Sequence, residues 1–172
     1  MQKFSRLWYF FRQNTIFLIT SIPVIIVDQL SKLWIKSNLA IGESTFEIGF
    51  FRLTHVRNTG SSFGLFQNQN LILSIFAIVG ACIILFLVFF MHRRFQILNT
   101  FLSKLSLGLI FAGAVGNLIN RLNFGYVVDF IDFNYWPAFN VADSSVVVGS
   151  ILLAYHLLRL STKEQSKNEK GG

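Results

Sequence analysis

The sequence predicts a mainly α-helical membrane protein, with four transmembrane helices and a small extracytoplasmic β-sheet between the first two spans. Two observations carry this prediction. Hydrophobic residues make up 53% of the 172 residues and charged residues only 13%, against about 25% charged in an average soluble domain. The hydrophobic residues also gather into four runs, and a helix needs about 20 mostly apolar residues to cross a bilayer.

The four apolar runs differ in the charges that they contain. They cover residues 16–35, 71–91, 101–119 and 141–160. The second run has no charge, whereas Asp28 and Lys32 interrupt the first and Asp143 lies near the start of the fourth. No small-residue cleavage site follows the first run, and three more spans come after it. The first run is therefore expected to be a retained helix and not a secretory signal.

A different pattern occupies residues 42–66, between the first two runs. Over residues 46–50, Phe and Ile alternate with Glu and Gly, and over 53–58 Leu, His and Arg alternate with Thr, Val and Asn. Alternation with Phe, Thr and Val enriched is typical of short strands. Turn-forming residues follow at Asn58 and Gly60. We therefore expect a small sheet, or cradle, lying on the membrane as an insertion in the membrane domain.

The whole of residues 1–160 is expected to form one four-span membrane domain. One domain or one small helical bundle suits a chain of this length. The remaining residues, 161–172, are polar and predict a disordered cytoplasmic tail.

Basic residues indicate how the four spans are oriented, because cytoplasmic loops are enriched in Lys and Arg. Of the 15 basic residues, three precede the first run, three lie around the turn between the second and third runs, and four lie from residue 159 to the C-terminus. Both termini are therefore expected on the cytoplasmic side, with residues 36–70 and 120–142 outside. This orientation places three acids near the outer interface: Asp28, Asp129 and Asp143.

Residues 117–145 contain three of the eight acidic residues of the chain, Asp129, Asp132 and Asp143. An acid beside a membrane span is costly and usually faces a cavity or a partner. Asp143 falls in the predicted first turn of the fourth span, with Asn140 as the expected N-cap, where the helix terminus favours negative charge. The apolar neighbours of Asp129 are expected to raise its pKa by desolvation.

Two nearby carboxylates in opposed environments tend to share one proton. Such a pair can hydrolyse a peptide bond, because one carboxylate draws a proton from water while the neutral acid hydrogen-bonds the scissile carbonyl. Asp129 and Asp143 are therefore a candidate catalytic pair.

The same acids permit other interpretations. Asp143 alone suits a helix cap, Asp129 or Asp132 suits an ion pair with Arg121, and spacing does not exclude Asp132 from the catalytic pair. If the segment is extended, residues 129 and 132 point to opposite faces.

Asp28 and Lys32 are four residues apart, and on a helix they would lie on one face. We favour the interpretation that they neutralise each other over the alternative that they take a direct part in the chemistry. The three histidines are scattered without metal-ligand spacing, so no metal site is predicted.

Five short motifs occur in order between residues 28 and 143. They are Asp28-Gln-Leu-Ser-Lys32, Asn58-Thr-Gly-Ser-Ser-Phe63, Gly116-Asn117-Leu118 with Arg121, Tyr126-Val-Val-Asp-Phe130 and Phe139-Asn-Val-Ala-Asp143. In this register the chain resembles the lipoprotein signal peptidases, or signal peptidase II family, whose two catalytic aspartates lie in the last two motifs. One such motif alone is weak, but five in order are highly specific.

The resemblance implies an aspartic endopeptidase of the bacterial inner membrane with four transmembrane helices, an outer β-cradle and an active site at the outer face. Its substrate class is the diacylglyceryl-modified prolipoprotein, which it cuts just before the lipidated cysteine. The catalytic pair would be Asp129 and Asp143. The supporting or substrate-binding residues would be Asp28, Lys32, Asn58, Gly60, Asn117, Arg121 and Asn140.

The expected partners are this lipid-modified substrate and membrane lipid. No nucleic acid, metal or organic cofactor is expected, and the protein is expected to be a monomer.

The chain departs from the family pattern at three positions. The family commonly has an aspartate where this chain has Asn120, which puts an ion pair with Arg121 in doubt. Ser61 and Ser62 occupy places where small apolar residues are usual. None of these changes falls on the proposed pair.

Two other functions compete with this one. A proton-coupled membrane carrier would relay protons through Asp28, Asp129 and Asp143. Against it, these acids lie near one interface, and no inverted repeat is evident. A structural membrane subunit is the other alternative, and it gives no reason for an acid pair at the mouth of the bundle.

Overall fold

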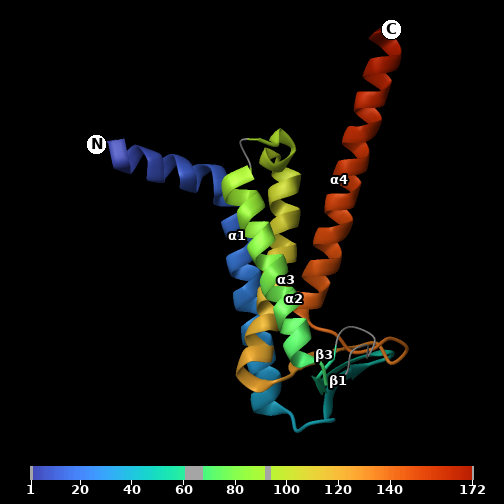
Figure 1. Ribbon diagram of the computed structural model, residues 1–172. Coiled ribbons are helices and arrows are strands. Elements are labelled where there is room, and N and C mark those ends of the chain that lie inside the picture. The colour runs from blue at the N-terminus through green and yellow to red at the C-terminus, as the bar shows by residue number, and fades with distance from the viewer. Residues whose placement is uncertain (1, 61–67, 92–93, 172) are drawn as a thin grey trace.

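A computed structural model describes residues 2–60, 68–91 and 94–171 (Figure 1). Within these residues, four helices are long and apolar enough to cross a membrane. They are Asn14–Asn38, Asn70–Met91, Phe101–Phe124 and Val141–Thr162. The four predicted spans and the mainly helical fold class are confirmed, and the chain is a multi-pass membrane protein.

The helical elements extend beyond these spans in two places. Their bounds are α1 Gln2–Asn38, α2 Asn70–Phe86, the π-helical η2 Leu87–Met91, the 3-10 helix η3 Gln96–Asn99, α3 Phe101–Phe124 and α4 Val141–Gly171. The first turns of α1 run away from the bundle, and both chain ends lie away from the sheet (Figure 1).

The C-terminal residues differ from the sequence-based expectation of a disordered tail over 161–172. The structure continues α4 as a helix through Gly171. Lys, Glu and Gln make up much of this segment, and these residues have good intrinsic helix propensity. A polar composition is therefore compatible with continuation of the helix that precedes it.

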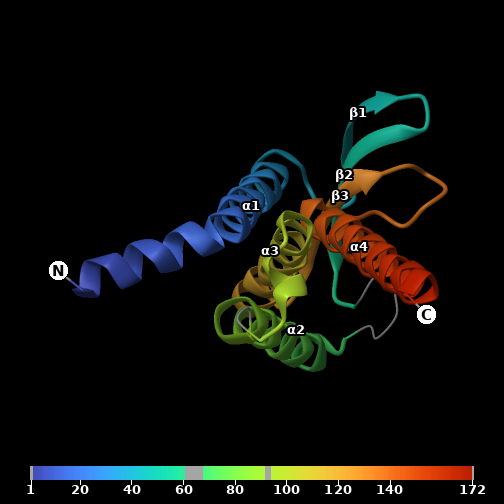
Figure 2. The same cartoon turned by 90° about the horizontal axis from the view of Figure 1, so that it is seen from above.

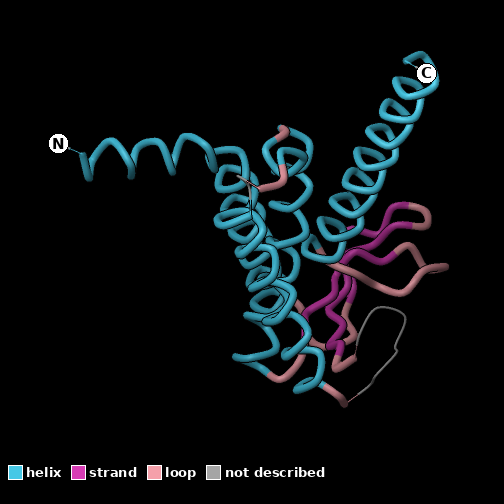
Figure 3. Tube along the Cα trace, turned by 45° about the horizontal axis from the view of Figure 1, so that its top comes forward, coloured by secondary structure: helices cyan, strands magenta, loops and turns pink. Residues whose placement is uncertain are grey.

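The sheet has three antiparallel strands in the order β1, β2, β3. Strands β1 (Ser44–Ile48) and β2 (Phe51–Asn58) form a hairpin in the segment between the first two spans where short strands were expected. Strand β3 (Val127–Asp132) comes instead from the connection between α3 and α4. Figure 2 shows the sheet beside the helices, and Figure 3 shows the strands in magenta next to the start of α4. The sheet thus joins two connections that are far apart in the sequence.

The turn into β3 depends on Gly125, which ends α3 with a φ of 76°. Glycine adopts this left-handed conformation without the steric penalty that other residues meet. The chain therefore reverses direction directly after the third span and pairs with β2 across the register Val56–Asp129.

Helix α3 lies at the centre of the bundle, where small residues allow close helix contacts. A Cβ atom added at Gly116 would lie 2.6 Å from the Asp28 Oδ2 atom on α1, and one added at Gly149 on α4 would lie 2.8 Å from the Ser106 carbonyl oxygen on α3. Close approach of α1, α3 and α4 brings their polar side chains together near the sheet.

Candidate active site

Asp129 lies in the middle of β3 and is only 2% exposed. Its Oδ2 atom accepts a hydrogen bond of 2.8 Å from the Asn58 amide on β2, and its Oδ1 atom accepts one of 2.6 Å from the Asn140 amide. Burial, followed by the negative charge of Asp143, raises the pKa of Asp129 to about 7, against the two amide hydrogen bonds and the charge of Lys32. Asp129 therefore holds a proton up to near-neutral pH.

Asp143 lies in the first turn of α4 and forms a capping box with Asn140. The Asn140 Oδ1 atom accepts from the Asp143 backbone N–H at 2.9 Å, and the Asp143 Oδ2 atom accepts from the Asn140 backbone N–H at 3.2 Å. This reciprocal arrangement satisfies two donors at the helix start and confirms the predicted N-cap. The helix terminus also stabilises a negative charge on Asp143.

Two asparagines connect the two carboxyl groups. Asn140 donates to Asp129 through its side chain and to Asp143 through its backbone. The Asn117 amide on α3 donates to Asp143 Oδ1 at 2.8 Å, and its Oδ1 atom accepts from Asn140 Nδ2 at 3.2 Å. One hydrogen-bond network thus joins the candidate pair.

The Asp28–Lys32 pair is a buried salt bridge of 2.8 Å on α1, which confirms its interpretation as a self-neutralising pair. It also reaches two other helices. Lys32 Nζ donates to Asn117 Oδ1 at 2.8 Å, and Asp28 Oδ1 accepts from the Ala142 backbone N–H at 2.9 Å. Because Ala142 directly precedes Asp143, the pair holds the start of α4 in place.

Gln29 extends this network and was absent from the sequence-predicted site. Its Nε2 atom donates to Asp28 Oδ2 at 2.8 Å and to the Gly116 carbonyl oxygen at 2.9 Å. Its Oε1 atom accepts from Asn120 Nδ2 at 3.1 Å. A polar residue next to Asp28 inside an apolar run was the available signal, because a buried amide in a membrane span needs hydrogen-bond partners.

Asn120, where the family commonly has an aspartate, is buried between α1 and β3. Besides its bond to Gln29, its Oδ1 atom accepts from the Val128 backbone N–H at 3.3 Å. Arg121 points elsewhere, and its Nη2 atom donates to the Gly60 carbonyl oxygen at 3.1 Å. The amide at position 120 therefore supports β3 next to Asp129 without an ion pair to Arg121.

Gly60 and Arg121 secure the turn that carries Asn58. The Gly60 backbone N–H donates to Asn58 Oδ1 at 2.9 Å, while its carbonyl oxygen accepts from Arg121. In the motif Asn58-Thr-Gly-Ser-Ser-Phe63, residues 61–63, including Ser61 and Ser62, lie outside the described residues.

Asp132 lies three residues after Asp129 and faces away from the candidate pair. Its Oδ2 atom accepts from Arg52 Nε and from Arg52 Nη2, both at 2.8 Å. The alternative that an acid of this segment takes part in an ion pair is thus correct for Asp132, but its partner is Arg52 on β2 and not Arg121.

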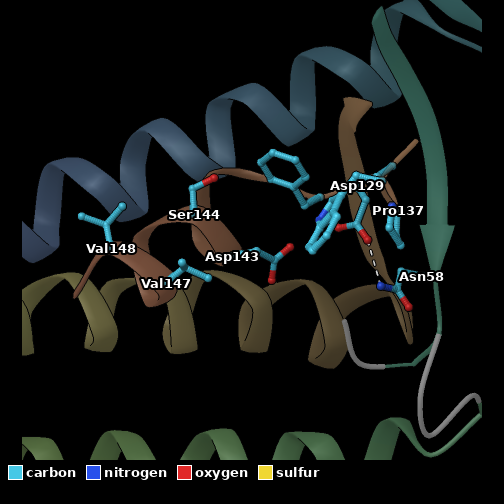
Figure 4. A pocket seen from close by; sticks show the side chains of 10 residues that line it. Asn58, Asp129, Pro137, Asp143, Ser144, Val147 and Val148 are labelled. Atoms are coloured by element: carbon cyan, nitrogen blue, oxygen red, sulfur yellow. Dashed lines mark hydrogen bonds between the residues drawn. The ribbon is translucent and has the colours of Figure 1, made fainter. Parts of the chain in front are cut away.

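A cavity of about 350 Å³ is lined by both candidate catalytic residues and by Asn58. Figure 4 shows Asp129 and Asp143 beside this space, with Val147 and Val148 farther along α4. The rest of the lining is mostly apolar, and its apolar side chains are Trp136, Pro137, Ala138, Phe139, Val147 and Val148. None of these six residues was among the site residues predicted from the sequence.

The arrangement suits acid–base chemistry on a substrate in this cavity. Two carboxyl groups reach one apolar space from different elements, and one of them has a pKa near neutrality. Two neighbouring carboxyl groups, one of them with a pKa near neutrality, can act as proton donor and proton acceptor.

Comparison with known proteins identifies relatives over nearly the whole chain. The profile of the family described as Signal peptidase (SPase) II matches residues 20–159. Lipoprotein signal peptidase from Moorella thermoacetica is 42% identical over 152 residues, covering 88% of this chain and 97% of the relative. Lipoprotein signal peptidase from Dehalococcoides mccartyi is 41% identical over 158 residues, covering 91% and 98%.

Solved structures agree with this sequence comparison. A bacterial membrane enzyme determined by the in meso method at 2.3 Å resolution has a TM-score of 0.78 and 31% identity, covering 86% of this chain and 90% of that one. A second, at 1.9 Å resolution, has a TM-score of 0.72 and 32% identity, covering 83% and 92%. Because the family profile covers most of the chain and relatives are about 40% identical over nearly their whole length, this chain belongs to the signal peptidase II family.

Proposed function

We propose that this chain is an aspartic endopeptidase that removes the signal peptide from diacylglyceryl-modified prolipoproteins, cutting before the lipidated cysteine. Relatives about 40% identical over most of the chain are lipoprotein signal peptidases. The observation that carries the aspartic mechanism is the convergence of Asp129 and Asp143 on one apolar cavity, with Asn140 bonded to both.

In this mechanism Asp129 carries the proton and Asp143 is the carboxylate. Asp143 takes a proton from a water molecule as the water oxygen attacks the scissile carbonyl carbon. Asp129 hydrogen-bonds the carbonyl oxygen and transfers its proton as negative charge develops there. Collapse of the tetrahedral intermediate returns that proton to Asp129, and the leaving nitrogen takes the proton held by Asp143. The two carboxyl groups regain their starting states.

The supporting residues hold the pair in position. Asn58 and Asn140 donate to Asp129, while Asn117 donates to Asp143. Farther from the carboxylates, Asp28 and Lys32 fix the start of α4, and Arg121 fixes the Gly60 turn. Positioning of this kind supplies a large part of the rate in reactions at a bound substrate.

We place the protein in the bacterial inner membrane as a monomer, within one membrane domain over residues 1–160, with membrane lipid around it. The distribution of basic residues supports cytoplasmic termini and an active site at the outer face. A cysteine at Asn123 in a Cys82→Ser background should then react with an impermeant thiol reagent added outside intact cells, and one at Arg94 should not. The reverse labelling pattern would invert the proposed orientation.

The proton-coupled carrier is not supported by the comparisons, because the chain belongs to a peptidase family. Asp28 accepts from the Ala142 backbone N–H and pairs with Lys32, while Asp129 and Asp143 both accept hydrogen bonds from Asn140. Among the described residues, these contacts join the helices and the sheet at one end of the bundle.

The function is tested directly with purified protein and a prolipoprotein that carries the diacylglyceryl group. Conversion to a shorter, still lipidated product is expected in a gel-shift assay, with mass spectrometry placing the new N-terminus at the modified cysteine. The same precursor without lipid is the matched control and should remain uncut. Absence of cleavage with the lipidated precursor, or cleavage at another bond, would contradict the proposal.

A further inference from the structure

The wall of the active-site cavity beyond the carboxylates is apolar, and several of its side chains are exposed. Trp136 is 54% exposed, Val147 57% and Val148 49%, and all three line the cavity. The two candidate catalytic carboxyl groups act only on the polar region around the scissile bond. The apolar wall is therefore suited to contact a different, apolar part of the substrate.

Two valines extend this apolar wall along α4. Val147 and Val148 follow Asp143 and Ser144 by four residues, so they lie on the same helical face about 6 Å farther along α4. Both belong to the apolar span Val141–Thr162. Because both valines are exposed and belong to a span, we expect this part of the cavity wall to face lipid.

Trp136 lines the same cavity from the loop between β3 and α4. An indole combines a large apolar surface with one polar N–H, and Trp accordingly concentrates at the membrane interface. The neighbouring Tyr135 is 92% exposed and does not line the cavity. The two aromatic residues therefore have different surroundings although they are adjacent in the chain.

The loop that carries Trp136 is pinned at both ends. At its start, Asp132 binds Arg52, and its Oδ1 atom accepts from the Asn134 backbone N–H at 2.8 Å. At its end, Phe139 exchanges backbone hydrogen bonds of 2.8 and 3.0 Å with Ile131. A loop fixed in this way holds Trp136 in a defined position in the cavity wall.

We propose that Trp136, Val147 and Val148 form a subsite for the acyl chains of the substrate, and that Trp136 determines selectivity for chain length. This subsite rests on the proposed function, because it receives the lipid attached to the cysteine next to the scissile bond. The chains lie between the Trp136 indole and the two valines and continue into the bilayer along α4. Binding of the lipid thereby aligns the adjacent peptide bond with Asp129 and Asp143.

The test compares one prolipoprotein carrying either long-chain or short-chain diacylglyceryl groups. Wild-type enzyme should have the lower KM for the long-chain substrate. Trp136→Ala should raise that KM about tenfold, equivalent to losing about 1.4 kcal/mol of binding, while kcat changes by less than about twofold. The ratio of short-chain to long-chain KM should fall towards one.

Two variants control for loss of folding or of general membrane contact. Trp136→Phe keeps an apolar ring and should retain most of the chain-length preference. Tyr135→Ala removes the adjacent exposed ring and should keep the wild-type KM ratio. An unchanged ratio in Trp136→Ala, or a fall in kcat alone, would overturn the subsite, whereas failure of the wild type to cut either substrate would overturn the proposed function instead.

Discussion

Asp129 and Asp132 lie three residues apart on β3, and both are buried, but they have different partners. On one face of the strand, the hydrogen-bond donors to Asp129 are the amides of Asn58 and Asn140. Asp132 faces the other side and binds the guanidinium of Arg52 through two nitrogen atoms. One strand therefore presents one carboxyl group with neutral donors and one with a cationic partner.

The difference shows how the fold assigns roles to carboxyl groups. Burial beside neutral hydrogen-bond donors leaves the proton affinity of an acid high. The pKa of Asp129 accordingly rises to about 7, which suits proton transfer near neutral pH. Asp132 is suited to holding the loop 133–139 against the sheet.

The largest expected loss of activity follows from replacing Asp129 or its partner Asp143. Asp129→Asn keeps the shape of the side chain and most of its hydrogen bonds but removes its titrating proton, and Asp143→Asn removes the proton acceptor. Each should lower kcat on the order of 10³-fold, as loss of acid–base catalysis does, measured by gel shift with lipidated precursor. Near-wild-type turnover in either variant would eliminate the proposed pair.

A smaller but still substantial loss is expected when the support behind the pair is displaced. Gly116→Ala would place a Cβ 2.6 Å from Asp28 Oδ2, forcing that carboxylate away from the Ala142 backbone N–H that precedes Asp143. We expect kcat to fall about 10- to 100-fold, because small misplacements of catalytic groups have effects of this size.

Gly80→Ala is the matched control for this glycine substitution. A Cβ at Gly80 would meet nothing within 4 Å, so activity should be unchanged and thermal stability equal or slightly higher, since alanine has the better helix propensity. Equal activity losses in the two alanine variants would indicate a general effect on the membrane helices.

The Asp132 side should give a modest effect. Asp132→Asn removes the charge that binds Arg52, and ion pairs with a partly exposed partner contribute about 0–1 kcal/mol. We expect kcat within about threefold of wild type, and Arg52→Gln should behave in the same way. A loss comparable with that of Asp129→Asn would place Asp132 in the chemistry and end the distinction between the two faces of β3.

The smallest expected effect is a shift in pH dependence. With Asp129 as the acid, kcat should fall as pH rises through about 7, because the proton is then lost. The Asn58 hydrogen bond lowers the pKa of Asp129, so Asn58→Ala should raise it and move the alkaline limb upward by less than about one pH unit. A profile that moves to lower pH would assign the limb to another group.

Local sequence patterns predicted the spans and the short strands that follow the first span, because these features depend on nearby residues. Hydropathy placed the four spans within about five residues of their ends, and alternation placed two strands that overlap β1 and β2. The N-cap at Asn140 was also predictable, since a helix cap is formed by residues three positions apart.

Long-range contacts explain what local patterns missed. Strand β3 joins the sheet only because α3 and α4 return to the same end of the bundle. The role of Gln29 depends on Asn120, which lies 91 positions away in the sequence. The apolar cavity wall combines a loop with one face of α4, so neither segment shows it alone.

The capping box at the start of α4 makes Asp143 part of a membrane-spanning helix, whereas Asp129 belongs to a sheet outside the spans. Bilayers of different thickness tilt or shift transmembrane helices, and such a displacement acts on α4 more than on the sheet. The hydrogen bond of 2.6 Å between the Asn140 amide and Asp129 links the two parts, so its geometry changes with the displacement. The spacing of the two carboxyl groups, and with it the hydrolytic rate, should therefore respond to the lipid chain length of the host membrane.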